Sequence, residues 1–257
     1  MRNADASKSF KKIQSWEDGE SAPTYPQLEQ LAEAYKVPIA VFFFPEPPSV
    51  PNIAQTFRTL PDTEFDQIPG RIRLLLRKAK ALQLNLMDLT GGRNTTARLI
   101  TRELSFPLDV NLRTMAEQVR AYLGVSLDAQ RSWQDDETAL ENWREAAFDA
   151  GIYVFKDAFR EEEFSGFCLY DDVFPIIYVN NTSAKTRQIF TMFHELAHLL
   201  FHTSGIDTVH DEFISHLTGE AQRIEVLCNR FAAEFLLPEA EEGRAGKGSR
   251  SVPSMET

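Results

Sequence analysis

FTMFHELAHLLFH, residues 190–202, is the most informative stretch of this chain. Its apolar residues recur at helical spacing, which predicts a single buried helix. Within that helix His194 and His198 are four residues apart. Both imidazoles therefore lie on one helix face, about 6 Å apart along the axis, where they can converge on one metal ion. This pattern is typical of a zinc site.

Glu195 follows the first of these histidines and flanks the same face. A catalytic zinc site has three protein ligands and keeps a fourth position for water, whose pKa the metal lowers to about 7. A carboxylate beside that water can accept its proton. We therefore expect Zn²⁺ as the cofactor and interpret Glu195 as the general base.

The third ligand has to come from outside this helical turn. His202 lies eight residues from His194, about 12 Å along a helix, whereas two ligands of one tetrahedral ion lie within about 4 Å of each other. The metzincin arrangement, with a glycine and then a histidine after the helix, is excluded because Phe201 and Ser204 occupy those positions.

A second helix is predicted over residues 225–237, where apolar residues recur at near-helical spacing before Pro238. Glu225 and Asn229 share its other face. Glu225 can therefore act as the third ligand, while Asn229 accepts a hydrogen bond from a ligand histidine and fixes its tautomer. Glu234 is the alternative carboxylate, nine residues further on and rotated about 180° around the helix. The residues alone leave this choice open.

The two stretches together, FTMFHELAHLLFH and IEVLCNRFAAEFLLP at 224–238, resemble the ImmA/IrrE family of gluzincin-like zinc metallopeptidases. In that family HExxH is followed by Glu-xxx-Asn/Asp-x-Phe-Ala-xxx-Leu-Leu-x-Pro, and the resemblance covers most of residues 8–238. It implies that His194, His198 and Glu225 are the zinc ligands and that Glu195 is the general base. It also implies that Asn229 contacts a zinc ligand and does not bind the zinc itself.

Two neighbouring positions depart from the family pattern. Many members have a second glutamate and then an alanine just before the Asn, where this chain has Leu227 and Cys228.

The resemblance also implies a function. We expect an endopeptidase that cleaves a helix-turn-helix transcriptional repressor and so relieves repression of a mobile element, a phage or a stress regulon. The alternative is a DNA-binding transcriptional regulator or antitoxin-like protein whose zinc peptidase fold is not catalytic.

The N-terminal segment SWEDGESAPTYPQLEQLAEAYKVPIAVFF, residues 15–43, resembles the C-terminal part of Xre-type helix-turn-helix domains. Too few residues precede it for the two helices that such a domain needs first, so we interpret residues 1–44 as a truncated remnant. Lys8, Lys11 and Lys12 are the candidate DNA contacts, because lysines can neutralise phosphates. A solvated helix face is the alternative interpretation, and truncation weakens the expectation of DNA binding.

The rest of the chain divides by composition. Closely spaced prolines predict an extended linker over residues 45–64. Residues 65–238 are interpreted as the metallopeptidase domain, which begins with a helical connector at 65–89. Further helices are predicted at 111–123 and 136–150, each closed by a glycine. Residues 239–257 contain almost no apolar side chains and predict a disordered, curtailed tail.

Strand-like segments follow at 152–155, 166–170 and 175–180. They predict a small antiparallel sheet whose last strand leads into the metal helix. The expected fold class is therefore α+β, mainly helical, with a gluzincin-like zinc peptidase domain. An edge strand beside a metal site is a template for an extended substrate, and we assign this role to the strand that contains Val179.

Three further expectations concern the surroundings of the metal helix. Thr182 or Ser183 is expected to be its N-cap. The polar segment 205–219 predicts a loop or short helices over the cleft. The candidates for stabilising the oxyanion of the tetrahedral intermediate are His210, His216, Tyr170 and Tyr178.

Composition limits the remaining function classes. The formal net charge of -11 opposes broad affinity for nucleic acids. Two cysteines, Cys168 and Cys228, cannot make a disulfide framework, and both lie in apolar surroundings where a buried thiol is usual. No signal-peptide pattern or membrane-length apolar run is present, so we expect a cytoplasmic protein with no membrane partner.

Overall fold

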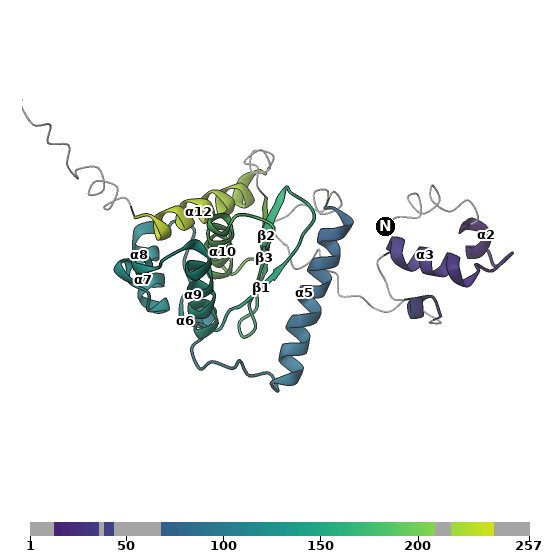
Figure 1. Cartoon of the computed structure of the whole chain (residues 1–257), viewed down its shortest axis with the longest axis horizontal. Coiled ribbons are helices and arrows are strands. Elements are labelled where there is room, and N and C mark those ends of the chain that lie inside the picture. The colour runs from purple at the N-terminus through teal and green to yellow at the C-terminus, as the bar shows by residue number, and fades with distance from the viewer. Residues whose placement is uncertain (1–12, 36–38, 44–67, 209–216, 239–257) are drawn as a thin grey trace, which may run out of the picture. The chain divides into compact units, whose positions relative to one another are not determined.

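The computed structural model describes residues 13–35, 39–43, 68–208 and 217–238 (Figure 1). The chain forms two compact units, Met1–Asn52 and Ile53–Thr257. The predicted linker at 45–64 and the predicted tail at 239–257 lie outside the described residues. None of the helices in the described part is long and apolar enough to cross a membrane.

Within its described residues, the first unit contains two short α-helices and a 3-10 helix, which are α2 (Ile13–Glu17), α3 (Tyr25–Tyr35) and η1 (Ile39–Phe43). Its core is small: Ile13 and Leu31 are buried, and Trp16, Leu28 and Tyr35 pack against them.

The other helices that the structure describes lie in the second unit. They are α5 (Gly70–Leu89), α6 (Ile100–Glu103), α7 (Leu112–Leu123), α8 (Leu127–Ser132), α9 (Asp136–Asp149), α10 (Lys185–Leu200) and α12 (Gly219–Leu236). The predicted helices at 111–123 and 136–150 correspond to α7 and α9. Gly124 ends α7 in the left-handed conformation at φ 70°, which glycine adopts without steric penalty.

A four-stranded sheet lies between α5 on one face and the other long helices on the opposite face (Figure 1). Its strands are β1 (Tyr153–Asp157), β2 (Phe164–Leu169), β3 (Ile176–Asn180) and β4 (Ile206–Thr208), in the order β1-β3-β2-β4. The α+β fold class is confirmed, but the sheet is mixed and not antiparallel throughout. β3 pairs antiparallel with β2 and parallel with β1.

The prediction that the strand containing Val179 lies at the edge of the sheet is wrong. Because β3 lies between β1 and β2, Val179 is in the interior of the sheet and its strand cannot add a substrate. All residues of β2 and β3 are buried, as expected for central strands covered on both faces. β4 follows α10 within the segment predicted as a loop, and the edges of the sheet are β1 and β4.

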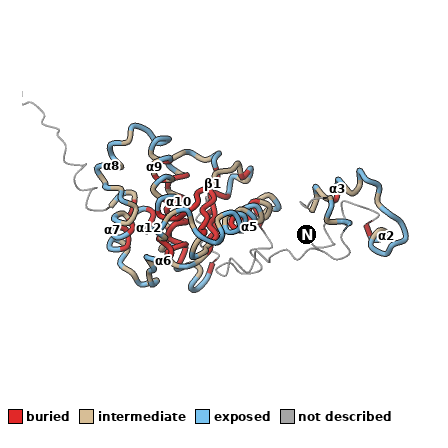
Figure 2. The backbone as a smooth tube through the Cα atoms, turned by 90° about the horizontal axis from the view of Figure 1, so that it is seen from below, coloured by how far each residue is buried: buried red, intermediate tan, exposed pale blue. Residues whose placement is uncertain are grey.

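Buried residues gather along the sheet and α10 (Figure 2). Side chains along β3 alternate between two cores. Ile177 and Val179 face α10, whereas Ile176 and Tyr178 face α5. The core on the α10 side is built on aromatic contacts: the rings of Phe193 and Phe235 stack with centroids 4.2 Å apart. This contact joins α10 to α12 and sets how their other faces meet.

The N-cap of α10 differs from the prediction, although the helix begins at Lys185, next to the residues expected to cap it. Its N-cap is Ala184, without a side-chain hydrogen bond. Thr182 donates its hydroxyl to Asn180 Oδ1 at 2.8 Å, so it closes the turn after β3 and does not cap the helix. α12 begins at Gly219, six residues before the predicted start, and Glu225 therefore lies well inside a helix and not at its exposed first turn.

Candidate metal centre

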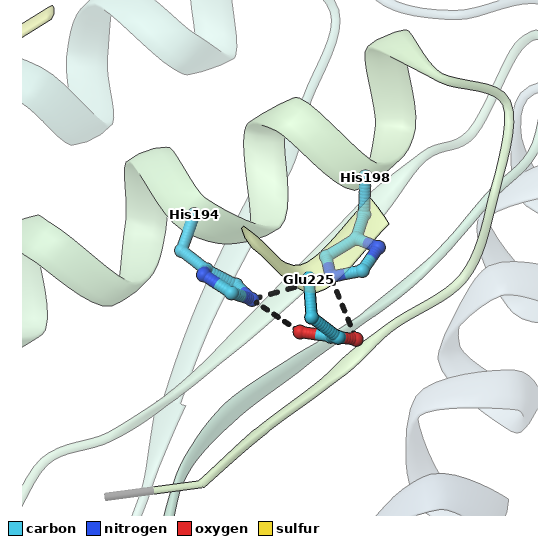
Figure 3. A group of neighbouring side chains, drawn as sticks. All are labelled: His194, His198 and Glu225. Carbon is cyan, nitrogen blue, oxygen red and sulfur yellow. Dashed lines mark hydrogen bonds and ion pairs between the residues drawn. The ribbon is translucent and has the colours of Figure 1, made fainter. Parts of the chain in front are cut away.

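α10 and α12 bring two histidines and a glutamate together in the core of the second unit (Figure 3). The Nε2 atoms of His194 and His198 are 3.2 Å apart. Glu225 Oε2 is 3.2 Å from His194 Nε2, and Glu225 Oε1 is 3.3 Å from His198 Nε2. All three side chains are buried, and their ligand atoms lie within 4.8 Å of one another. Glu234, the alternative carboxylate, is not in this group.

The second ring nitrogen of each histidine has its own partner. His194 Nδ1 lies 2.9 Å from Asn229 Oδ1, the contact expected for Asn229. An amide oxygen only accepts, so Nδ1 carries a hydrogen and Nε2 is the nitrogen that faces Glu225 and is placed to bind a metal. His198 Nδ1 lies 3.2 Å from Thr203 Oγ1. Sequence reasoning missed Thr203, because the turn after α10 carries no motif that points to it.

Glu195 is fully buried beside these ligands, and neither of its carboxylate oxygens has a hydrogen-bond partner among the described residues. Burial raises the pKa of Glu195 to about 7, against the opposing effect of His198 and His194. A buried carboxylate without a partner is unfavourable for folding, and such groups concentrate at functional sites. With this pKa the carboxylate can both accept and release a proton near neutral pH.

The charges of the candidate ligands and of nearby Asp207 shift one another's pKa values. Burial on its own would raise the pKa of Glu225, but His198 and His194 hold it well below its usual range. Burial would lower the pKa of His194, but Asp207 and the hydrogen bond to Glu225 raise it to about 10. At neutral pH the group therefore holds a proton on His194, and the same charges favour a bound cation.

Asp207 on β4 is a further buried acid near the site. It accepts hydrogen bonds from Arg187 Nη2 at 3.0 and 3.3 Å and from Thr191 Oγ1 at 2.8 Å. Both donors lie on α10, so Asp207 fixes β4 against the helix that carries the histidines. The three-residue strand is too short for a recognisable alternation in the sequence, which is why Asp207 was not identified there.

The predicted oxyanion stabilisers are not all near the site. Tyr178 lies on the opposite face of the sheet, stacked on Phe167 with ring centroids 5.0 Å apart, so this assignment is wrong. Tyr170 is on the side of α10, where its ring contacts His202 and its hydroxyl donates to Asp172. Outside the described residues lie His210, His216, Lys8, Lys11 and Lys12.

Both cysteines are free and buried, as the sequence indicated. Burial raises the pKa of Cys168 and of Cys228 well above the usual value for a thiol. Both therefore stay neutral, whereas a metal-binding cysteine is a thiolate.

Comparison with known protein families gives one match. Residues 147–250 match the model of the IrrE N-terminal-like domain, Peptidase_M78. This range contains all the candidate ligands, together with Glu195 and Asn229. The match supports a relation to the ImmA/IrrE family, which the motifs resemble, and it supports a peptidase of the metal-dependent type. A search of curated proteins gives no match.

Proposed function

We propose that this chain is a zinc-dependent endopeptidase of the ImmA/IrrE type, in which His194, His198 and Glu225 hold the metal and Glu195 is the general base. One observation carries the proposal: two imidazole nitrogens and a carboxylate converge within 4.8 Å in the core, beside a second carboxylate that has no partner among the described residues. The match of residues 147–250 to a peptidase domain supports it.

The spacing of the ligand atoms fits zinc. Ligands that bind one tetrahedral zinc ion at about 2.0 to 2.1 Å are about 3.3 Å from each other. The two Nε2 atoms are 3.2 Å apart, and each has a different oxygen of Glu225 near it, Oε2 at 3.2 Å from His194 and Oε1 at 3.3 Å from His198. Two histidines and one glutamate are also the donor set of known catalytic zinc sites, which leave one position open. When bound, zinc supplies Lewis-acid chemistry that lowers the pKa of a water molecule and polarises a peptide carbonyl.

Glu195 performs the proton transfers in this proposal. Its carboxylate accepts a proton from the attacking water and later donates it to the nitrogen of the leaving amine. The pKa of about 7 suits both steps, because the group is easily protonated and deprotonated at neutral pH. The Glu195 side chain is itself fully buried, which keeps bulk water from competing for this proton.

β4 is the strand that we propose as the substrate template. Gly205, directly before β4, packs on the imidazole of His198, so the strand begins at the metal centre. In the described part of the chain β4 pairs only with β2. An extended peptide that adds to the outer edge of β4 would pass the ligands in a defined register.

We further propose that the substrate is a helix-turn-helix transcriptional repressor and that cleavage relieves repression. The support for this substrate is the resemblance to the ImmA/IrrE family and the domain match. The pair of helices α2 and α3 in the first unit has its own small core and is available as a recognition element, for a protein or for DNA.

The test is co-expression with helix-turn-helix repressors encoded near the gene. We expect the wild-type chain to contain zinc and to cleave one of them, and Glu195→Gln to keep the zinc but lose cleavage. Glu234→Gln, a change at a carboxylate outside the buried group, is the matched control and should cleave normally. Cleavage by Glu195→Gln at the wild-type rate would contradict the proposal. Sequence-specific DNA binding without proteolysis at any zinc concentration would favour the regulator instead.

A further inference from the structure

We infer that the turn after α10 is part of the metal centre: Thr203 fixes the hydrogen on His198 Nδ1, and Gly205 provides the space that the His198 imidazole occupies. Both are positioning residues that act through His198. The inference rests on the proposed function, since it concerns one of the three proposed zinc ligands.

The hydrogen-bond geometry of Thr203 determines the tautomer of His198. Thr203 Oγ1 lies 3.1 Å from the backbone oxygen of His198 and 3.2 Å from His198 Nδ1. The hydroxyl has a single hydrogen, and a carbonyl oxygen can only accept, so that hydrogen points to the backbone oxygen. Oγ1 must then accept from His198 Nδ1, which carries the ring hydrogen. The lone pair is left on Nε2, the nitrogen that faces Glu225.

The two histidines are therefore held in the same tautomer by partners from different segments. Asn229 on α12 holds His194, and Thr203 in the turn holds His198. Partners of this kind orient metal ligands and tune their basicity. The family motif accounts for only one of the two, because Asn229 lies within it and Thr203 does not.

A reversal of the chain at His202 places Thr203 back under the helix. His202 has φ 57°, in the left-handed region that non-glycine residues rarely adopt. As a result the backbone nitrogen of Thr203 donates to His198 O at 2.9 Å, and the Thr203 side chain lies beside the ring of the same histidine.

Gly205 touches the other side of the imidazole. A Cβ at this position would lie 2.5 Å from His198 Cδ2, 2.6 Å from Nε2 and 2.7 Å from Cγ. Gly205 is not among the positive-φ residues, so its backbone would accept alanine and the restriction is one of space. A methyl group here has to displace the ring that carries the proposed ligand atom.

The turn cannot easily move away to make that space, because β2 holds it. The backbone nitrogen of Cys168 donates to Gly205 O at 3.0 Å, and Gly205 N donates to Cys168 Sγ at 3.3 Å. The backbone nitrogen of Tyr170 donates to Ser204 Oγ at 2.9 Å. Because these hydrogen bonds hold the turn in place, a change at Thr203 or Gly205 should displace the His198 side chain and not the turn.

The first experiment measures the zinc affinity of the full chain by competition with a chromophoric chelator. Thr203→Val keeps the shape of the side chain and removes the hydroxyl, whereas Thr203→Ser keeps the hydroxyl. We expect the zinc Kd to rise about tenfold or more for Thr203→Val and to stay near the wild-type value for Thr203→Ser. Equal weakening by both variants would overturn the role of the hydroxyl.

A spectroscopic signature separates this role from a general effect on stability. In the zinc-loaded protein, proton NMR should show protected Nδ1–H signals from both ligand histidines. Thr203→Val should remove the His198 signal alone, and Asn229→Ala should remove the His194 signal alone. An unchanged His198 signal and unchanged Kd in Thr203→Val would overturn the inference.

Gly205→Ala independently tests the role of Gly205 in making space for the His198 imidazole. It also tests the inference if Thr203→Val does not fold. We expect at least a tenfold rise in the zinc Kd. The matched control is Gly70→Ala, because Gly70 has no atom within 4 Å of an added Cβ and no positive φ. Wild-type zinc affinity in Gly205→Ala would show that the ring is not confined there. A wild-type chain that binds no zinc would instead contradict the proposed function, so the two failures are distinguishable.

Discussion

Replacing Glu195 with glutamine should stabilise the metal-free protein at neutral and higher pH, although the same change should abolish catalysis. The carboxylate is fully buried and has no hydrogen-bond partner among the described residues. Its ionised form is therefore poorly solvated in the folded state and well solvated in the unfolded state. Glutamine has nearly the same shape and is neutral at every pH.

The size of the effect follows from the pKa of Glu195, which rises from 4.5 to about 7 on folding. Between these two values the folded state binds a proton that the unfolded state has released. Wild-type stability therefore falls as the pH rises through this window, by 1.36 kcal/mol per pH unit, or about 3 kcal/mol in total. Glu195→Gln lacks this term, while the other titrating groups are common to both proteins.

The assay is urea unfolding of both proteins between pH 5 and 8 in the presence of a chelator. We expect the advantage of Glu195→Gln in the free energy of unfolding to grow by about 2.5 kcal/mol between pH 5 and pH 8, because part of the effect is already present at pH 5. Glu234→Gln serves as the control for losing a carboxylate elsewhere. A difference between Glu195→Gln and wild type that is the same at pH 5 and pH 8 would refute the reasoning.

Three further predictions concern the ligands and the packing behind them. Because the pKa of His194 is raised to about 10, zinc must displace its proton, and zinc affinity should rise about tenfold per pH unit from pH 7 toward 10; calorimetry that detects no proton release at pH 8 would contradict this. Arg120→Ala should lower the free energy of unfolding by about 2 kcal/mol in urea, since the guanidinium donates to Phe235 O at the end of α12; an unchanged value would contradict that anchor. Gly166→Ala should be destabilising by about 1 to 3 kcal/mol, because its Cβ would meet Thr191 and lie 2.8 Å from Tyr178 O. A neutral result in thermal unfolding would show that β2 can move away from α10.

Local helix geometry explains which parts of the site the sequence could predict. His194, Glu195 and His198 lie within one stretch of helix, so their spacing alone places them together. The choice between Glu225 and Glu234 as the third ligand depends on which face of α12 packs against α10. The stacking of Phe193 on Phe235 sets this, and the resemblance to a family supplied the answer before the structure did.

The remaining parts of the site depend on contacts that no local pattern reveals. Insertion of β3 between β1 and β2 makes one pair parallel and removes Val179 from the edge. The alternating pattern around Tyr178 predicts a strand, but it does not predict which face of the sheet α10 covers. The sequence therefore could not place Tyr178 on the face away from the metal centre. Thr203 and Asp207 reach the site from a turn and a three-residue strand, both too short to leave a periodic signal.

Metal content of the purified chain tests the central claim most directly. We predict about one zinc per chain for the wild-type protein and for Glu234→Ala, and little or none for Glu225→Ala, because Glu225 is the only carboxylate in the buried group of the described residues. Full zinc occupancy in Glu225→Ala would contradict the account, since the two histidines would then bind the metal with some other partner.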